Sequence, residues 1–372
     1  MIVTPAFYAD HKLQDATFAR LRKEDPLAWC EPEAFRPFWA VTKHADIMEV
    51  SRQNALFTNG EREMLSYHEA EKGVYAKFGQ PHLLKTLVQL DDPVHYKLRH
   101  LTQEWFMPQN VKKREDAIKT IAKQYVDRME DLGGACDFQR DVALYYPLRV
   151  IMDILGVPPE DEPRMLMLTQ QLFGPTDPEL NRSREAITSA EQAIAMLNYV
   201  IADFENYFGA LTAERRANPR EDIATVIANA TINGEQIPDR EMSGYYMIVA
   251  TAGHDTTSAS TAGAIMELAK NPALFERFRG AEADKAGLIE EAIRWTTPVQ
   301  HFMRSAKEDV EIGGQTISAG DWLMLNYVSA NRDEDVFADP FAFNPDREKN
   351  QQIAFGFGAH VCLGQHLARM EM

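Results

Sequence analysis

The stretch FGFGAHVCLG, residues 355–364, places three glycines, two phenylalanines, a histidine and a cysteine within ten residues. Glycine adopts backbone angles that other residues avoid, and it lets a backbone approach a ligand closely. The residues that follow, LGQHLARMEM, have a helical composition. Cys362 is therefore expected just before a helix N-terminus, where the helix dipole and free amides favour the thiolate, a strong ligand for a metal.

A purely structural role for Cys362 stays open at this point, whereas two other kinds of binding site are disfavoured. A lone cysteine is most often a small buried apolar residue. A zinc site built from His360, Cys362 and His366 is disfavoured, because three ligands at these spacings match none of the usual zinc patterns. A dinucleotide-binding loop would need a third glycine where Val361 stands, and it would need a strand before the loop and a helix after it.

Composition narrows the class of protein. The 372 residues are 45% hydrophobic, which is ample for a large packed core, and the formal net charge is −17. This acidity argues against nucleic acid as the main partner, since binding phosphates needs a basic surface. The three cysteines lie far apart in the sequence, so we expect no disulfide framework, and a reducing cytoplasm fits.

Nothing in the sequence points to a membrane or to export. The N-terminal residues, MIVTPAFYADHKLQD, lack the basic and apolar regions of a signal peptide. The longest apolar stretch, residues 245–253, is far shorter than the ~20 residues that span a bilayer. We therefore expect a soluble cytoplasmic protein.

The hydrophobic pattern is mainly helical. Residues 93–270 carry apolar side chains at three- and four-residue spacing, most clearly in 143–156 and 193–208. A strand is predicted over residues 37–41, and a hairpin and a further strand follow Asp309. The expectation is a mainly α (α+β) fold with small sheets, forming one domain over residues 1–372.

The stretch YYMIVATAGHDTTSASTAGAIMELAKN, residues 245–271, is a helical pattern interrupted in its middle. Glycine and short polar side chains at 253–257 weaken or compete with helical hydrogen bonds. We expect the Thr256 hydroxyl to bond the carbonyl of Ala252, one turn back, and to bend the helix. A kink made only for packing would explain the pattern, and so would a notch that holds a small molecule beside the Asp255 acid and a hydroxyl.

A hydrolase-like dyad of His254 and Asp255 is not expected. Adjacent residues of a continuous helix point about 100° apart, which keeps their side chains from meeting.

Two further pairs stand at helical spacing. Glu291 and Arg294 are three residues apart and can pair, as surface residues commonly do. His95 and Arg99 are four apart and share one helical face, which is as consistent with a solvated face as with a binding role. A basic group, defined here as Lys97, Lys112, Lys113 and Arg114, stands out in the acidic chain, and a solvated charge run explains it equally well.

These motifs together resemble the cytochrome P450 superfamily. FGFGAHVCLG matches its haem-binding signature, F-G-x-G-x-[HR]-x-C-x-G, at every fixed position. AGHDTT is similar to the family pattern [AG]-G-x-[DE]-T, and Glu291-x-x-Arg294 with Arg347 resembles its structural triad, although Glu348 replaces the usual aromatic residue. The stretches ALYYPL, ATAGHDTT and SANRDEDVF look most like the bacterial branch that oxidises the monoterpene alcohol terpineol.

The resemblance implies a role for each matching residue. Cys362 would be the proximal ligand of the iron in haem b (iron protoporphyrin IX), and Asp255 and Thr256 would help to protonate dioxygen. Further haem contacts would be His95, Arg99, Ala252, Gly253, Arg304, Phe355, Gly356, His360 and Gly364. The substrate pocket would involve residues 60–90, Leu172, Phe173, Val299, His301 and Phe302. The structural triad would be Glu291, Arg294 and Arg347.

The resemblance also implies an activity. The chain would be a haem-thiolate monooxygenase that uses O2 and electrons from NAD(P)H, delivered through a ferredoxin reductase and an iron–sulfur ferredoxin, to hydroxylate a small apolar substrate. A terpenoid or an alkyl-aromatic molecule would suit it, and the basic group would steer an acidic ferredoxin. The alternative is a non-catalytic haem-thiolate protein that senses or carries a diatomic ligand; such a protein has no need of Asp255 and Thr256. Family members usually continue for several tens of residues after the cysteine helix, so we expect the end at Met372 to be a truncation.

Overall fold

The computed structural model describes residues 2–174, 190–280 and 284–372. It is mainly helical with small sheets, as the sequence predicts. The chain forms two compact units, one of residues 1–68, 259–365 and 372, the other of residues 69–258 and 366–371. No helix among the described residues is long and apolar enough to cross a membrane.

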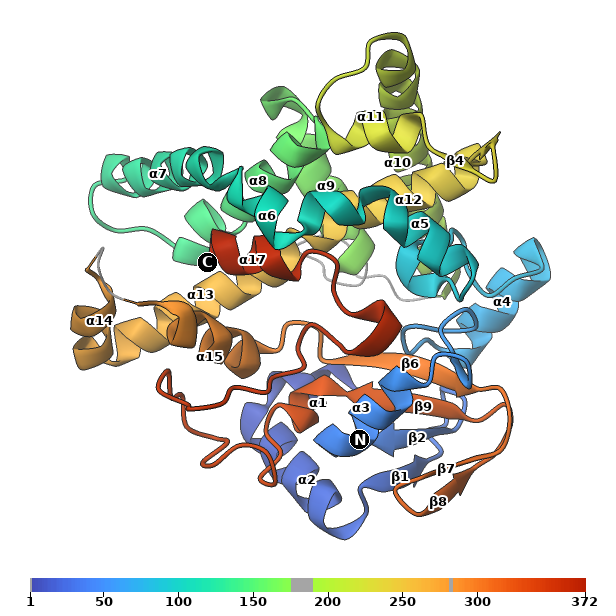
Figure 1. The fold of residues 1–372 in the computed structure, drawn as a ribbon. Helices are drawn as coiled ribbons and strands as arrows, with labels where there is room; N and C mark the ends of the chain where they lie inside the picture. Colours follow the sequence, from blue (N-terminus) through green and yellow to red (C-terminus); the bar gives the residue numbers. More distant parts are fainter. Residues whose placement is uncertain (1, 175–189, 281–283) are drawn as a thin grey trace. The chain divides into compact units, whose positions relative to one another are not determined.

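The first unit is built on a five-stranded sheet in the order β1-β2-β9-β6-β3 (Figure 1). β9 pairs parallel to β2 and antiparallel to β6, with Met324 opposite both Ala40 and Met303. The strands are β1 (Leu27–Cys30), β2 (Phe38–Val41), β3 (Phe57–Thr58), β6 (His301–Ala306), β7 (Val310–Ile312), β8 (Gln315–Ile317) and β9 (Trp322–Asn326). The helices are α1 (Pro5–Ala9), α2 (His11–Glu24), α3 (His44–Arg52), α14 (Pro272–Phe278), α15 (Ala286–Thr296), α16 (Tyr327–Ala330) and the 3-10 helix η5 (Gly358–His360).

Side chains of the sheet alternate between two apolar cores. Ala40, Met303 and Met324 pack with residues of α1 and α2, while Leu323 and Leu325 pack with residues of α3 and of the β7–β8 hairpin. This alternation is the period-two pattern of a sheet covered on both faces. The predicted strand over residues 37–41 is thus confirmed as the buried strand β2.

The predicted hairpin is also confirmed. Gly313 and Gly314 connect β7 to β8 with φ angles of +53° and +79°. Two successive positive φ angles suit the tight two-residue turn of a hairpin, and glycine adopts them without strain.

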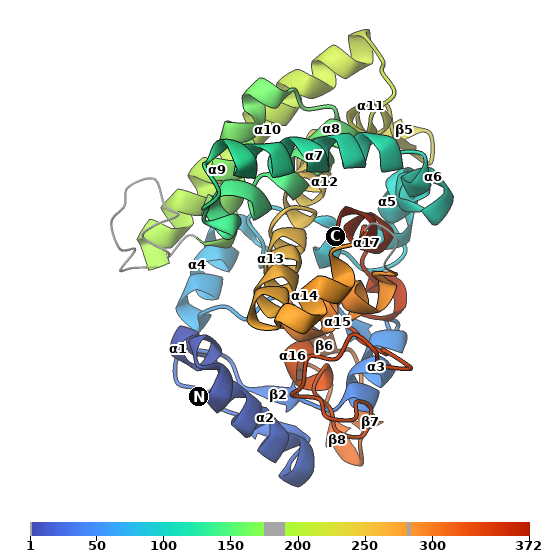
Figure 2. The same ribbon diagram turned by 90° about the vertical axis from the view of Figure 1, so that its left-hand side faces the viewer.

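The second unit is helical apart from the small β4–β5 ribbon (Figures 1 and 2). Its central helix, α12, contacts α8, α9, α10 and α11. The α-helices are α4 (His68–Phe78), α5 (Val94–Gln103), α6 (Pro108–Lys112), α7 (Glu115–Asp131), α8 (Tyr146–Leu155), α9 (Glu162–Phe173), α10 (Ala190–Ala217), α11 (Ile223–Ala228), α12 (Asp239–Ala252) and α17 (Gln365–Glu371). The shorter elements are η1 (Leu87–Gln89), η2 (Glu104–Phe106), the π-helix η3 (Gln139–Ala143), η4 (Pro159–Asp161), β4 (Thr231–Ile232) and β5 (Glu235–Gln236). Helix α13 (Asp255–Lys270) begins in this unit and continues into the first.

Candidate functional site

The cysteine loop of the first unit is held by its own backbone. The Cys362 amide donates to the carbonyl of Phe355 at 2.8 Å, which closes the loop into a compact turn. Gly356 and Gly358 have φ angles of +71° and +73°. A Cβ at Gly358 would lie 2.0 Å from the carbonyl oxygen of Ser51, so only glycine lets the loop lie against the end of α3.

The surroundings of Cys362 fit a haem. The loop is rich in apolar residues, yet the whole stretch 354–366 is only half-buried, and Cys362 forms no disulfide with another described cysteine. A Cβ at Gly364 would meet nothing within 4 Å. Among the described residues, no three His, Cys, Asp or Glu side chains gather as a metal-binding group. A porphyrin itself supplies four ligands to its iron, so the protein needs to add only one thiolate. Cys362, in an apolar loop that contains glycines, is suited to supply it.

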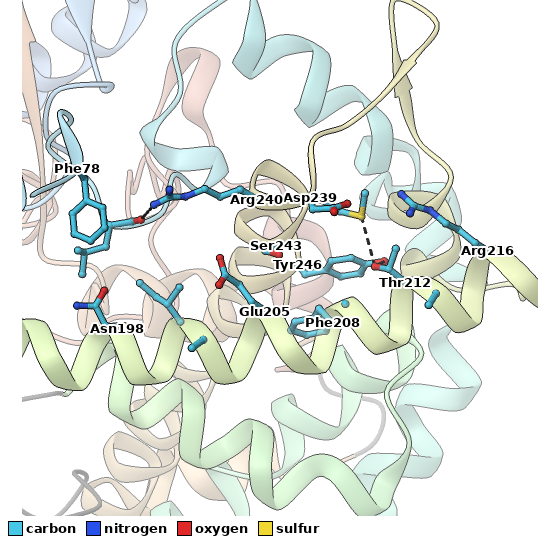
Figure 3. Close-up of a pocket in the computed structure, with 16 residues that line it drawn as sticks. Phe78, Asn198, Glu205, Phe208, Thr212, Arg216, Asp239, Arg240, Ser243 and Tyr246 are labelled. Carbon is cyan, nitrogen blue, oxygen red and sulfur yellow. Dashed lines mark hydrogen bonds between the residues drawn. The ribbon is translucent and has the colours of Figure 1, made fainter.

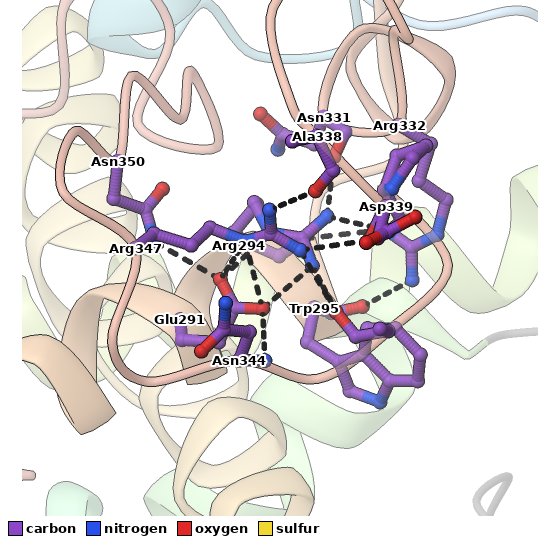
Figure 4. Close-up of polar contacts among 12 residues, drawn as sticks. Glu291, Arg294, Trp295, Asn331, Arg332, Ala338, Asp339, Asn344, Arg347 and Asn350 are labelled. Atoms are coloured by element: carbon purple, nitrogen blue, oxygen red, sulfur yellow. Dashed lines mark hydrogen bonds and ion pairs between the residues drawn. The ribbon is translucent and has the colours of Figure 1, made fainter.

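A buried ionic network stabilises the same unit (Figure 4). Arg294 donates to both carboxylate oxygens of Glu291, at 2.7 and 2.8 Å, and Arg347 donates to the same carboxylate at 3.0 and 3.2 Å. Glu291 and Arg294 are fully buried. The Phe337 ring lies 5.3 Å from the Arg294 guanidinium and 5.9 Å from that of Arg347. Phe337 therefore supplies the aromatic contact that the exposed Glu348 cannot.

Strand β6 carries three of the predicted site residues. Phe302 packs against the Tyr327 ring, and the buried Arg304 donates to the carbonyl of Met303 at 2.7 Å. His301, at the start of the strand, lies with its ring centroid 6.0 Å from that of Tyr8. Both His301 ring nitrogens are buried without a hydrogen-bond partner among the described residues, and burial lowers the pKa of His301 to about 4. Val299 is half-buried just before the strand.

In the second unit the predicted interruption of the long helix is present. Helix α12 ends at Ala252 and α13 begins at Asp255. The Thr256 hydroxyl donates to the Ala252 carbonyl at 3.0 Å, as the sequence predicts. Gly253 lies against α8, because a Cβ there would come within 3.2 Å of Ile151. Ala252 is exposed although most of α12 is buried, which leaves open surface beside the acid and the alcohol.

The expectation that His254 and Asp255 stay apart is wrong. His254 Nδ1 lies 3.2 Å from Asp255 Oδ1. The prediction assumed a continuous helix, whereas the break falls between α12 and α13 and changes the direction of the backbone at these two residues. His254 was missed as a member of the site for this reason, although the glycine before it is a sequence signal of a break.

The remaining predicted residues of this unit lie on two helices. His95 and Arg99 are neighbours on α5, where burial, followed by the positive charge of Arg99, lowers the pKa of His95. Leu172 and Phe173 close the C-terminal end of α9, and the Phe173 side chain is exposed. Residues 60–90 include all of α4 and η1.

The second unit also contains a cavity of about 600 Å³ lined by α4, α10 and α12 (Figure 3). The Tyr246 ring stacks on Phe208 at 4.8 Å, and its hydroxyl donates to the carbonyl of Ala224 at 2.8 Å. Glu205 and Ser243 line the cavity as well. The cavity lies along the first two turns of α12. Phe78 and Leu83, from the range 60–90 predicted for the substrate pocket, line it, whereas none of the residues predicted to contact the haem does.

Comparisons with known proteins identify the family of the chain. The family model of cytochrome P450 matches residues 46–284 and 286–372. Cytochrome P450-terp of a Pseudomonas species is 43% identical over 376 residues, which cover 100% of this chain and 87% of that protein. Linalool 8-monooxygenase of Pseudomonas putida is 34% identical over 359 residues, 95% of this chain and 85% of that protein.

Solved structures agree with the fold. The crystal structure of CYP108D1 from Novosphingobium aromaticivorans has 48% sequence identity and a TM-score of 0.87, and the match covers 97% of this chain and 85% of that one. The P450 fold and the branch expected from the sequence are thereby confirmed. The chain belongs to the cytochrome P450 family and is a P450 monooxygenase.

Proposed function

We propose that this monooxygenase inserts one oxygen atom of O2 into a C–H bond of a small apolar substrate, either a terpenoid or an alkyl-aromatic molecule. A haem b held by Cys362 would supply the oxidative chemistry, since a thiolate ligand favours cleavage of the O–O bond. The electrons would come from NAD(P)H through a ferredoxin reductase and an iron–sulfur ferredoxin. The relative named for linalool supports a terpenoid substrate.

The break between α12 and α13 carries this proposal. It sets an acid, Asp255, next to an alcohol, Thr256, beside the exposed surface of Ala252. The Thr256 hydroxyl donates its proton to the Ala252 carbonyl, so its oxygen is free to accept from another donor. Burial raises the pKa of Asp255, which keeps a transferable proton on its carboxyl group to a higher pH. In this arrangement Asp255 supplies protons and Thr256 relays them.

The thiolate assignment is tested with the haem-loaded protein, reduced with dithionite and exposed to carbon monoxide. A strongly red-shifted Soret band in the difference spectrum is expected, and C362S should abolish it. C136S is the matched control, because Cys136 is likewise half-buried and outside any disulfide among the described residues, but it lies outside the loop. A wild-type band at the position typical of histidine- or thiol-ligated haem would overturn the assignment.

Turnover tests the activity. With a ferredoxin and its reductase, we expect a hydroxylated product from a terpenoid or alkyl-aromatic substrate. T256V should lower the fraction of consumed O2 that appears in product by about tenfold or more, because the relay hydroxyl is lost while the shape is kept. T256S should restore it. Normal spectra with no turnover of any such substrate would favour the sensor or carrier instead.

A further inference from the structure

The contact between His254 and Asp255 involves a histidine whose tautomer can be assigned from its other hydrogen bond. His254 is fully buried, and its Nε2 lies 2.6 Å from the carbonyl oxygen of Leu144. A carbonyl oxygen only accepts, so Nε2 carries a hydrogen and donates it. The other nitrogen, Nδ1, lies 3.2 Å from Asp255 Oδ1 and has no hydrogen-bond partner among the described residues.

The proton count between these two atoms decides whether the contact is favourable. A neutral imidazole with its hydrogen on Nε2 presents a lone pair at Nδ1, and an ionised carboxylate presents lone pairs as well. Two acceptors at 3.2 Å in a buried site repel each other, whereas one shared proton joins them in a hydrogen bond. The contact is therefore favourable when a single proton lies between Oδ1 and Nδ1.

We propose that His254 is a positioning residue for proton delivery, one that shares a single proton with Asp255 and fixes that carboxyl group beside Thr256. The proposal rests on the proposed role of Asp255 as the proton donor. Asp255 loses its proton and takes another from water, which reaches it because its side chain is 34% exposed. His254, with a side chain that is 0% exposed, keeps its Nε2 hydrogen on the Leu144 carbonyl throughout.

The protonation of His254 and Asp255 depends on their burial and on their mutual contact more than on other charged groups. Burial lowers the pKa of His254 and raises that of Asp255. Each of the two groups partly offsets the effect of burial on the other, and the hydrogen bond to the Leu144 carbonyl acts in the same direction on His254. Of the elements packed here, α8 presents the apolar Ile151, and η3 presents the neutral Gln139, which bonds Ser258 at 3.2 Å. No other charged side chain among the described residues sets the protonation of the pair.

The proposal is tested by infrared spectroscopy of the haem-loaded protein with carbon-13 in its aspartate carboxyl groups. The band of protonated Asp255 is identified by its absence in D255N. We expect H254F and H254Q to shift this band to higher frequency, because the hydrogen bond to Nδ1 is lost. H254Q is included in case H254F fails to fold, because the amide nitrogen of glutamine can still donate to the Leu144 carbonyl.

The control is H44F. His44 is also buried, and its Nε2 lies 2.8 Å from the carbonyl of Gln351, so H44F removes the same kind of contact in the other unit. Its Asp255 band should not move. An Asp255 band that is absent from the wild type near neutral pH, or that is equal in the wild type, H254F and H254Q, would overturn the proposal.

Turnover separates this inference from the proposed function. H254F and H254Q should lower product formed per NAD(P)H by about tenfold, less than a positioned acid itself contributes, because Asp255 remains. If D255N formed as much product per NAD(P)H as the wild type, this result would contradict the role of Asp255 and with it the proposed function. If D255N formed less product per NAD(P)H while both His254 variants equalled the wild type, only the role of His254 would be overturned.

Discussion

At the scale of single residues, the buried surroundings of His301 disfavour the positive charge of a protonated imidazole. Its two ring nitrogens are buried without partners among the described residues, beside the equally unpartnered Tyr8 hydroxyl. Burial penalises the imidazolium, which is why the pKa of His301 falls to about 4 from 6.5. The unfolded chain therefore binds a proton between these two pH values that the folded chain does not.

This difference predicts how stability depends on pH. When the unfolded state binds more protons, the free energy of unfolding falls as the pH falls, here from about 6.5 to about 4, by up to about 3 kcal/mol from this residue. H301F should flatten that part of the profile in urea unfolding measured at several pH values. H11Q, at an exposed histidine, is the control and should leave it unchanged. An equal acid-side loss in the wild type and H301F would contradict the prediction.

Residues also show where sequence reasoning succeeds. The bond from Thr256 to the Ala252 carbonyl was predictable, because a threonine in a helix reaches the carbonyl one turn back wherever it occurs. The contact of His254 with Asp255 was not predictable, because it depends on backbone angles at the break. The contacts of Phe337 with Arg294 and Arg347 join residues 43 and 10 positions apart, which no local pattern specifies.

At the scale of elements, the cysteine loop depends on Gly358 in two ways. Its φ of +73° is costly for other residues, and an added Cβ would lie 2.0 Å from the Ser51 carbonyl oxygen. Gly356 shares the angle, at +71°, but its Cβ would be no closer than 3.7 Å to another atom. Substituting each glycine in turn therefore distinguishes the cost of backbone strain, which both positions share, from the cost of steric overlap, which arises only at Gly358.

We expect G356A to cost only the strain, about 1–2 kcal/mol, and G358A to cost clearly more and to lower haem content. The ratio of Soret to protein absorbance after purification measures haem content, and urea unfolding measures stability. Equal losses in the two variants would show that the contact with α3 does not constrain the loop.

The helix α15 is tied to the irregular segment after α16 by Glu291. Its carboxylate accepts from Arg294 and Arg347, and also from the backbone amide of Asn344 at 2.7 Å. E291Q should destabilise the protein by about 3–5 kcal/mol, because it leaves two buried guanidinium groups without a counter-charge. E348Q removes an exposed carboxylate nearby and should change stability by less than about 0.5 kcal/mol. A similar shift of the melting temperature in both variants would contradict this role for the network.

The elements themselves were largely predictable from hydrophobic periodicity. Strand β2 and the β7–β8 hairpin match their predicted positions, because a short apolar run of strand-forming residues and paired glycines are local signals. The order of the five-stranded sheet was not predictable, since the parallel pairing of β2 with β9 joins residues nearly 300 positions apart. The cavity beside α12 had no sequence signal either, because it is defined by three helices that are distant along the chain.

At the scale of the whole molecule, charge is unevenly distributed. The formal net charge is −17, yet the basic group lies within residues 97–114 of α5, α6 and their surroundings. Arg114 lies 3.7 Å from Asp153, whereas Lys112 and Lys113 are exposed and form no ion pair with any described residue. An acidic redox partner would be repelled by most of such a surface and attracted to these lysines.

The basic group should therefore govern association with a ferredoxin. We expect the double variant K112Q/K113Q to slow reduction by an acidic ferredoxin by about three- to tenfold at low ionic strength, and to flatten its salt dependence, because long-range attraction is screened by salt. Stopped-flow reduction under carbon monoxide measures the rate. K119Q/K123Q removes the same two charges from α7, where both lysines pair with carboxylates, and it should have little effect. If both double variants slow reduction equally, net charge rather than the basic group guides the partner.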